Sequence, residues 1–327
     1  MKILFDVEYP FAWAHGGEQV LVEGLMTHLP ELGVEVEPLK WWDEKQHGDI
    51  INMFYLPSNA AKFAKIKGIK IVSYVYLDGY TSKGKKELFG RKLFIKAFNR
   101  VFANYATSLG FKYPIIADAY IYPSNPDKLM GNYLFNAELD KSYVISHGID
   151  DKYFIEKNLP VRSNYLISIS TIHERKNNVL LGKIAKKLNL PIIFLGKPYG
   201  KNDPYYLEFL SLVDNKNVIY KGFVGEAEKI EYLKRARGFI LLSKTESFNY
   251  ATLEAFALGC PVFLPDLGWA RGLYDGYAEF GDLKDMSKLQ CQIQSFYNCP
   301  DRINKKYLVP TWKEVSQAYL DVYKSIL

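Results

Sequence analysis

Short apolar runs alternate along the chain with longer stretches in which apolar positions recur every third or fourth residue. In the first half, the apolar runs predict strands at Lys2–Val7, Val34–Leu39, Asp49–Leu56, Lys70–Leu77, Ala119–Tyr122 and Ser142–Ser146. Helical spacing covers Gly17–Leu32 and the basic stretch Lys83–Ala106. Strands that alternate with helices in this order predict βαβ units and a parallel sheet.

The same alternation begins again in the second half. Strands are predicted at Tyr165–Ser170, Ile192–Leu195, Val218–Gly222, Phe239–Ser243 and Val262–Leu264. Helices are predicted at Val179–Leu188, Tyr205–Val213, Ala227–Arg235, Tyr250–Leu258 and Trp312–Ile326. Between the halves, Gly148–Asn164 is polar, contains Pro160 and lacks periodicity, which is typical of a link between domains. We therefore expect an α/β protein with two Rossmann-like parallel-sheet domains, residues 1–155 and 156–310, that face each other across a cleft.

Composition narrows the class of protein. The chain has 327 residues, of which 48% are hydrophobic, so it contains enough apolar material for two cores. The net charge of +6 suits a protein that handles phosphates or rests on an anionic membrane, and it is too weak to indicate nucleic-acid binding. The three cysteines, Cys260, Cys291 and Cys299, lack metal-ligand spacing and indicate a reducing compartment. Without a signal-peptide pattern or an apolar run long enough for a transmembrane helix, we expect a cytoplasmic protein.

Loops that follow predicted strands are the candidates for chemistry, because open α/β sheets bind ligands at the carboxyl ends of their strands. The first such loop, Ala14–Glu18, contains Gly16 and Gly17 at the start of a predicted helix. Glycines at this position let a phosphate or a sugar approach the backbone closely. A tight turn would explain the two glycines equally well.

The second candidate loop is Ser170–Lys176, which lies between a predicted strand and a predicted helix. Its adjacent Arg175 and Lys176 could neutralise a diphosphate. The alternative is a solvated basic pair. Because a cation at a helix start opposes the helix dipole, we favour the functional interpretation.

The third candidate loop is Lys244–Glu254, with Glu246 in the loop and Glu254 about one turn inside the following helix. Backbone N–H groups around Phe248–Ala251 would point out of the helix start towards an anion. A carboxylate on each side of that anion could bind sugar or ribose hydroxyls. The alternative is that Glu246 caps the helix and Glu254 faces solvent, and spacing alone does not decide between the two.

The stretch Glu246–Val262, which reads ESFNYATLEAFALGCPV, resembles the signature of the retaining GT-B glycosyltransferases of family 4, usually E-G-F-G-x-x-x-x-E-A-x-A-x-G-x-P-V. The matching positions are Glu246, Phe248, Glu254, Ala255, Ala257, Gly259, Pro261 and Val262. Further stretches follow the family in order: Ala117–Ser124, Val144–Asp150, Leu166–Asn177, Val218–Val224 and the start of the final helix at Trp312. The resemblance implies the GT-B fold, with the last helix, residues 311–327, crossing back to the first domain.

The resemblance also implies roles for individual residues. Glu246 would contact the donor sugar near the reacting carbon, and Glu254 would bind the ribose. Lys176, together with Arg175, would stabilise the departing diphosphate. Gly16 and Gly17 would let the first domain close on the donor. The remaining positions implied in donor binding are Thr171, Phe223 beside the base, Ser247, Phe248, Asn249 and Tyr250. No cofactor and no catalytic metal are implied, and the co-substrate would be a UDP- or GDP-sugar.

The chain departs from the family pattern at three places. The usual arginine of the donor loop appears as Ser170 or Thr171. Two glycines of the glutamate loop are replaced by Ser247 and Asn249. Relatives usually carry a histidine after the fourth strand of the first domain, and here Asp78 is at or beside that place. Asp78 is therefore a candidate for a catalytic or acceptor-orienting acid.

Residues 83–100 combine basic and apolar positions. The basic residues are Lys83, Lys85, Lys86, Arg91, Lys92, Lys96 and Arg100, and the apolar residues among them are Leu88, Phe89, Leu93, Phe94, Ile95 and Phe98. This pattern suits peripheral contact with an anionic membrane or with an acidic acceptor. The alternative, which we favour from the sequence, is a surface helix whose apolar side packs into the core.

These observations lead to one main hypothesis and to alternatives. The main hypothesis is retaining transfer of a sugar from a nucleotide-diphosphate-sugar donor to a hydroxyl of a glycan, lipid or protein acceptor. A non-catalytic nucleotide-sugar-binding protein on the same fold is the alternative, and the missing arginine and glycines favour it. An epimerase or another dinucleotide enzyme is disfavoured, because the chain lacks a glycine fingerprint.

Overall fold

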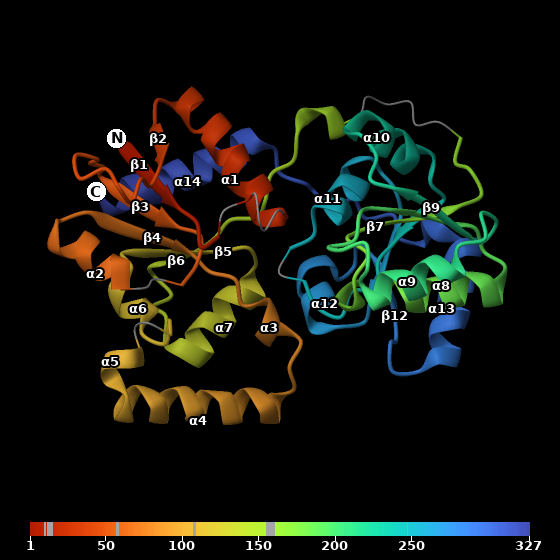
Figure 1. The fold of residues 1–327 in the computed structure, drawn as a ribbon, viewed down its shortest axis with the longest axis horizontal. Coiled ribbons are helices and arrows are strands. Elements are labelled where there is room, and N and C mark those ends of the chain that lie inside the picture. The colour runs from red at the N-terminus through yellow and green to blue at the C-terminus, as the bar shows by residue number, and fades with distance from the viewer. Residues whose placement is uncertain (10, 12–15, 57–58, 107–108, 155–160, 247) are drawn as a thin grey trace. The chain divides into compact units, whose positions relative to one another are not determined.

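The computed structural model describes residues 1–327 except 10, 12–15, 57–58, 107–108, 155–160 and 247 (Figure 1). The chain divides into two compact units. Unit 1 consists of Met1–Gly148 together with Pro310–Leu327, and unit 2 consists of Ile149–Val309. The boundary predicted between residues 155 and 156 falls outside the described residues.

Unit 1 is built on a six-stranded sheet in the order β2-β1-β3-β4-β5-β6, and all neighbouring strands are parallel. Its strands are β1 (Lys2–Asp6), β2 (Glu35–Pro38), β3 (Ile50–Met53), β4 (Lys70–Tyr74), β5 (Ala119–Tyr122) and β6 (Ser142–Val144). Its helices are α1 (Gly17–His28), α2 (Asn59–Ile66), α3 (Asp78–Thr81), α4 (Lys85–Val101), α5 (Ala103–Ala106), α6 (Tyr113–Ile116), α7 (Asn125–Phe135) and α14 (Trp312–Ile326), with the 3₁₀ turn η1 (Pro30–Leu32).

The last helix of the chain packs within unit 1, beside α1 (Figure 1). The indole of Trp312 lies against Gly24, where an added Cβ would come within 2.4 Å of the ring. The buried hydroxyl of Tyr323 donates to Asn52 Oδ1 at 3.0 Å. Thr311 and Glu314 form a capping box that fixes the start of α14. Unit 1 therefore depends on two stretches that lie far apart in the sequence.

Unit 2 has a second parallel six-stranded sheet, in the order β12-β11-β10-β7-β8-β9. Its strands are β7 (Leu166–Ile169), β8 (Ile192–Leu195), β9 (Val218–Gly222), β10 (Gly238–Ile240), β11 (Val262–Pro265) and β12 (Glu279–Gly281). Its helices are α8 (Asn178–Leu188), α9 (Pro204–Leu212), α10 (Glu226–Arg235), α11 (Tyr250–Ala257), α12 (Gly268–Tyr274) and α13 (Met286–Asn298). Its 3₁₀ turns are η2 (Asp151–Tyr153), η3 (Glu174–Lys176) and η4 (Pro300–Arg302).

Burial on both faces explains why the strands read as continuous apolar runs. Every residue of Ile192–Leu195 and of Val262–Pro265 is buried. The predicted fold class, an α/β protein with two parallel-sheet domains, is confirmed.

Two predicted helices differ from the structure. The helix predicted over Gly17–Leu32 is wrong at its end, because α1 stops at His28 and Pro30 begins η1. Proline has no N–H with which to continue the helical ladder. The stretch Lys83–Ala106 is divided into α4 and α5 at Phe102, whose backbone is not helical. In α4, Ile95 is buried and Leu88 and Phe98 are half-buried, whereas Phe89, Leu93 and Phe94 are exposed, so half of the apolar residues that we expected in the core are exposed. No described helix has both the length and the apolar content needed to span a bilayer.

Candidate active site

The chain reverses direction across the second sheet between β7 and β10. From β7 the chain continues to β8 and β9 on one side, and it then returns to β10, β11 and β12 on the other. The loops that follow β7 and β10 therefore diverge, and open α/β sheets bind their ligands at such a point. The loop after β7 contains Thr171, Arg175 and Lys176, and the loop after β10 contains Glu246.

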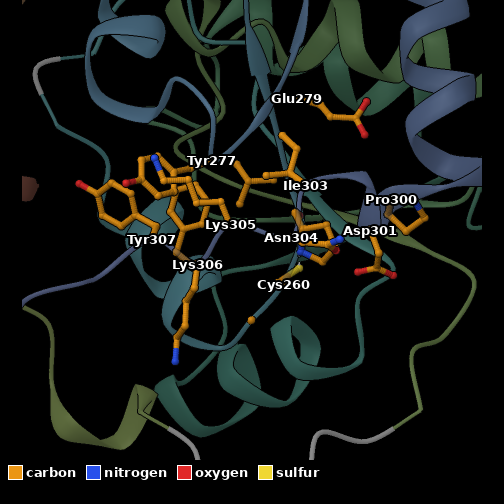
Figure 2. A pocket seen from close by; sticks show the side chains of 14 residues that line it. Cys260, Tyr277, Glu279, Pro300, Asp301, Ile303, Asn304, Lys305, Lys306 and Tyr307 are labelled. Atoms are coloured by element: carbon orange, nitrogen blue, oxygen red, sulfur yellow. Dashed lines mark hydrogen bonds between the residues drawn. The ribbon is translucent and has the colours of Figure 1, made fainter.

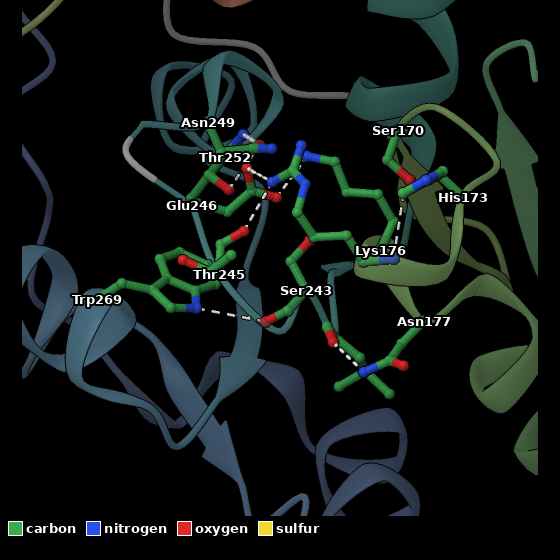
Figure 3. A network of polar contacts seen from close by, with 12 residues as sticks. Ser170, His173, Lys176, Asn177, Ser243, Thr245, Glu246, Asn249, Thr252 and Trp269 are labelled. Atoms are coloured by element: carbon green, nitrogen blue, oxygen red, sulfur yellow. Dashed lines mark hydrogen bonds and ion pairs between the residues drawn. The ribbon is translucent and has the colours of Figure 1, made fainter. Parts of the chain in front are cut away.

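The carboxylate of Glu246 lies between the two cations of the β7 loop (Figure 3). Its residue is only 4% exposed. Oε2 accepts a hydrogen bond from Arg175 Nη1 at 2.9 Å, and Oε1 accepts one from Lys176 Nζ. Arg175 Nη1 also donates to the carbonyl of Thr245 at 2.7 Å. A buried carboxylate is costly unless it is paired, and the two cations provide that pairing.

Backbone and amide contacts hold the β7 loop in place. The carbonyl of Arg175 accepts from the N–H of Lys244 at 2.8 Å, which joins the β7 loop to the β10 loop. Asn177, at a φ of 57°, donates from its amide to the carbonyl of Leu242 at 2.8 Å. Asparagine tolerates this left-handed backbone better than most residues. The cations are therefore positioned by the loop that also carries their partner.

Gly196, at the end of β8, makes a close approach to the β7 loop. A Cβ at this position would lie 2.0 Å from the carbonyl oxygen of Ser170, and its φ is +134°. Ser170 in turn accepts a hydrogen bond from Asn178 Nδ2 at 3.0 Å. Only glycine fits here, and the sequence reasoning did not single it out. A glycine directly after a predicted strand was the available signal.

Glu254 lies in a second ion-paired cluster, one turn into α11. The residue is 8% exposed, and Lys229 Nζ of α10 donates to its Oε1 at 2.9 Å. Lys229 also contacts Glu226 at 3.3 Å, and the hydroxyl of Tyr153 donates to Glu226. Burial raises the pKa of Glu254, and Lys229 opposes that rise. Both alternatives set against a functional role are therefore wrong: Glu254 does not face solvent, and Asn249 rather than Glu246 caps α11.

At the start of α11, the side chains of Phe248 and Asn249 have structural roles, and the backbone N–H groups of the first turn are the groups that could bind a ligand. The side chain of Asn249 accepts from the N–H of Thr252 at 2.9 Å, as a helix cap does. Phe248 is buried in the core of unit 2, so its side chain packs rather than points to a ligand. Tyr250 opens the helix, whose first-turn N–H groups point out of its end. Ser247 lies outside the described residues.

Of the other predicted site residues, Thr171 and Phe223 lie in unit 2, and Gly16, Gly17 and Asp78 lie in unit 1. Thr171 is half-buried directly after β7, and Phe223 is exposed after β9, with Lys197 Nζ 5.5 Å from its ring centroid. Gly16 and Gly17 are exposed at the start of α1 in unit 1. At Gly16 the φ of 169° is open to any residue. Asp78 is described through its backbone, as the first residue of α3 after β4.

A cavity of about 360 Å³ lies beyond the carboxyl ends of β1, β3 and β4. Among its lining residues are Glu8 after β1, Tyr55 after β3 and Glu18 in the first turn of α1. Between β1 and β3 the first sheet also reverses direction, because β2 lies on the far side of β1. Burial, with a contribution from Glu8, raises the pKa of Glu18 to about 7. Neither Glu8 nor Glu18 was predicted as a site residue, although Glu18 ends the candidate loop Ala14–Glu18.

A smaller cavity, of about 180 Å³, lies at the amino ends of β11 and β12 (Figure 2). Its lining includes Cys260, Glu279, Asn304 and Tyr307. None of the predicted site residues lines it. Because it lies at the amino ends of the strands, it is at the opposite edge of the sheet from the Glu246 network.

Residues 150–278 match the family described as "Glycosyl transferases group 1". This match lies within unit 2 and contains the Glu246 and Glu254 networks. No curated protein is significantly similar to this chain in sequence.

Solved structures resemble the whole chain. Anabaena HepE in complex with UDP and glucose has a TM-score of 0.69 at 14% identity, covering 99% of this chain and 100% of HepE. Sucrose-phosphate synthase from Thermosynechococcus elongatus has a TM-score of 0.71 at 13% identity, covering 100% and 99% of the two chains. A glycosyltransferase from Rickettsia africae has a TM-score of 0.66 at 13% identity, covering 99% and 98%. The fold is thus the two-domain α/β fold of the GT-B glycosyltransferases.

Proposed function

We propose that this protein transfers a sugar from a nucleotide-diphosphate-sugar donor to an acceptor hydroxyl with retention of configuration, as in family 4. The observation that carries the proposal is the buried Glu246 carboxylate between Arg175 and Lys176, at the direction reversal of the second sheet. The match of residues 150–278 to a glycosyltransferase family supports it. HepE, which has the same fold, has been crystallised with UDP and with UDP-glucose, so uridine donors are the first to test.

The positive charge of the site suits a leaving diphosphate. When the bond between the sugar's anomeric carbon and the phosphate oxygen breaks, the electron pair and the negative charge stay on the diphosphate. Fixed cations that face this developing charge lower the barrier. The Arg175 atoms Nη2 and Nε make no hydrogen bond within the described part of the chain, so they remain as donors for phosphate oxygens.

The carboxylate between the cations suits the sugar. A carboxylate has about four lone-pair positions, and each oxygen of Glu246 uses one of them for a cation. The remaining positions can accept hydrogen bonds from sugar hydroxyls. The cations fix the orientation of the carboxylate before the donor arrives.

Glu254 is the proposed acceptor of hydrogen bonds from the ribose. It lies one turn inside the helix whose first-turn N–H groups would face the diphosphate. Lys229, which pairs with it at 2.9 Å, holds the carboxylate in place. Donor binding then engages one helix through its amides and through a side chain on its first turns.

The acceptor side of the proposal rests on unit 1. Asp78 and the Glu8–Glu18 cavity are the two candidates for orienting the acceptor hydroxyl. Asp78→Asn and Glu18→Gln should each leave nucleotide binding unchanged, and the variant at the true site should raise the KM for the acceptor or lower kcat. Full turnover by Asp78→Asn would remove Asp78 from the proposal.

The decisive experiment measures nucleoside diphosphate release from a panel of UDP-, GDP-, ADP- and dTDP-sugars with mixed acceptors. A thermal-shift screen comes first, because a ligand at about 100 times its Kd adds roughly 2.7 kcal/mol of stability. NMR of the product then reads the anomeric configuration, and inversion would contradict a retaining transfer. Because Arg175 and Lys176 supply the charge that a metal ion supplies in other sites, we expect turnover to persist in EDTA.

A non-catalytic nucleotide-sugar binder is the second candidate. It is favoured by Ser170 or Thr171 in place of the expected arginine, and by Ser247 and Asn249 in place of the expected glycines. Binding of a nucleotide sugar without release of diphosphate, for every acceptor offered, would select this candidate over the transferase.

A further inference from the structure

The exposed side of α4 and of the segment after it forms an apolar strip, which we name the α4 face. On α4, Phe89, Leu93 and Phe94 are 57%, 51% and 50% exposed. Val101 at the end of α4, and Phe102 and Tyr105 in the segment after it, are also at least half exposed. Within α4, Phe89, Leu93 and Val101 are spaced by four and eight residues, which places them along one side of the helix. Ordinary surface helices bury their apolar stripe, and here only Ile95 of α4 is buried.

The opposite side of α4 explains how the helix is attached. Ile95 and Leu88 belong to or pack against the core of unit 1, and Lys92 Nζ lies 4.2 Å from the ring centroid of Tyr133 on α7. In Figure 1, α4 runs as an orange helix along the outer edge of unit 1, with α7 on its inner side. The α4 face is therefore turned away from its own unit.

The basic charge of the protein is concentrated on this helix. Lys and Arg exceed Asp and Glu by six in the whole chain. Residues 83–100 hold seven basic residues and the single acid Glu87, so the excess in this segment is the same and the rest of the chain is balanced. Lys85, Lys86, Lys96 and Arg100 are exposed beside the apolar strip. Exposed aromatic and aliphatic groups flanked by lysines fit the boundary between anionic headgroups and acyl chains.

A groove beside α3 adds to this chemistry. It has a volume of about 550 Å³ and is lined by Tyr80, Lys83, Arg91 and Phe94, among others. The guanidinium of Arg91 lies 5.5 Å from the ring centroid of Phe94 and donates to the hydroxyl of Tyr80 at 3.4 Å. Cationic and aromatic groups thus meet at the edge of the α4 face.

We propose that the α4 face docks unit 1 on the surface of an anionic lipid bilayer. Phe89, Leu93 and Phe94 would enter the interface between headgroups and acyl chains, while the flanking lysines and Arg100 would contact lipid phosphates. The charge supplies long-range attraction that salt screens, and the apolar strip supplies contact that salt does not screen. This proposal does not depend on sugar transfer.

The test is co-sedimentation of the full chain with phosphatidylcholine vesicles, with and without phosphatidylglycerol. We expect binding to the anionic vesicles only, and weaker binding as salt is added. Each basic residue near an anionic surface raises partitioning roughly fivefold, so Lys85→Gln/Lys86→Gln/Lys96→Gln should weaken binding by about a hundredfold. The matched control, Lys187→Gln/Lys201→Gln/Lys216→Gln, removes the same charge from exposed positions of unit 2 and should change binding little.

A second variant separates docking from general charge attraction. Phe89→Ser/Leu93→Ser keeps the charge, and it should abolish the binding that remains at high salt. Circular dichroism confirms that each variant is folded. No binding of the wild type to anionic vesicles at low salt would overturn the proposal, and so would equal losses in the α4 and control triples. A dimer that is lost in the α4 triple, without vesicle binding by the wild type, would assign the face to a second copy instead.

Discussion

At the scale of single residues, the candidate site consists of a buried carboxylate and the cations that pair with it. Glu246 is almost fully buried, and its two oxygens are paired with cations from a loop about seventy residues earlier in the chain. Removing one member of such a group leaves a buried charge short of partners. Glu246 has two cations, so loss of one still leaves it paired, and this permits a test of chemistry without loss of the fold.

Lys176→Met should lower kcat by about a hundredfold or more, because it removes the fixed charge that we propose faces the leaving diphosphate. The fold should survive, since Arg175 still pairs with Glu246 at 2.9 Å. Lys183→Met is the matched control, because Lys183 forms an exposed ion pair with Glu208 at 2.7 Å in the same unit. Steady-state kinetics with both variants decide the matter, and equal activity of the two would remove Lys176 from the catalytic role.

His147 should contribute a loss of stability in mild acid, which its substitution removes. Its Nε2 contacts the Tyr74 hydroxyl at 2.6 Å, and burial lowers the pKa of the imidazole from 6.5 to about 3. Below pH 6.5 the unfolded chain therefore binds a proton that the folded chain refuses, and the free energy of unfolding falls with pH, by at most about 1.4 kcal/mol per pH unit from this group. Urea unfolding from about pH 7 to about pH 5 measures the slope. His147→Gln should flatten it, and an unchanged slope would contradict the assignment.

At the scale of elements, the active site depends on how strand ends meet. The β7 loop is held from two sides, by the β10 loop through Arg175 and Asn177 and by the end of β8 through Gly196. The order of the strands brings these strand ends together. The conformation of the β7 loop then sets the positions of Arg175 and Lys176. A change in the support of the loop should thus affect donor binding without touching a ligand-binding side chain.

Gly196→Ala should destabilise the protein by roughly 2 kcal/mol or more, because its Cβ would lie 2.0 Å from the Ser170 oxygen in a backbone conformation that disfavours alanine. We expect weaker nucleotide binding as well, since the β7 loop must shift. Gly200→Ala, where nothing lies within 4 Å of the added Cβ, is the control and should be close to neutral. Chemical denaturation of both variants provides the comparison, and similar midpoints would refute the close-approach argument.

At the scale of the whole molecule, the chain leaves unit 1 at Gly148 and returns to it at Pro310. Unit 1 is therefore complete only when α14 is in place. The helix contributes Trp312, Tyr319, Leu320 and Tyr323 as buried side chains, so it belongs to the core rather than to the surface. A substitution that destabilises α14 should consequently destabilise the sheet of unit 1.

Trp312→Ala should cost about 3–5 kcal/mol, since it leaves a cavity beside Gly24. The loss should fall on unit 1: hydrogen exchange should speed up in β1–β6, with little change in β7–β12. Trp42→Ala removes the same side chain type from an exposed position of unit 1 and should have little effect. Equal acceleration of exchange in both sheets after Trp312→Ala would show that the two units do not unfold separately.

The sequence by itself determined the elements and the chemistry available to them. Apolar runs located the strands because a strand buried on both faces must be apolar along its length, as Ala119–Tyr122 and Ile192–Leu195 are, and both were predicted with their observed bounds. The edge strand Val218–Gly222 is only partly buried, and its bounds were also predicted. No helices were predicted at α2, α7, α12 and α13, of which α2 and α12 are short, with 8 and 7 residues. The sequence pattern around Glu246 and Glu254 predicted the fold and identified these two glutamates as candidate site residues.

Only the tertiary structure decided which charges meet. Spacing could not distinguish a capping glutamate from a buried one, because burial depends on strand order and on loops that lie far away in the chain. The pairing of Glu246 with Arg175 and Lys176, the pairing of Glu254 with Lys229, and the cavity with Glu8 and Glu18 all arise that way. The same holds for α4: its amphipathic pattern was visible in the sequence, but only packing shows that its apolar face is turned outward. The local sequence pattern shows which side chains of a segment are apolar, but the packing of distant segments determines which side chains become buried and what they contact.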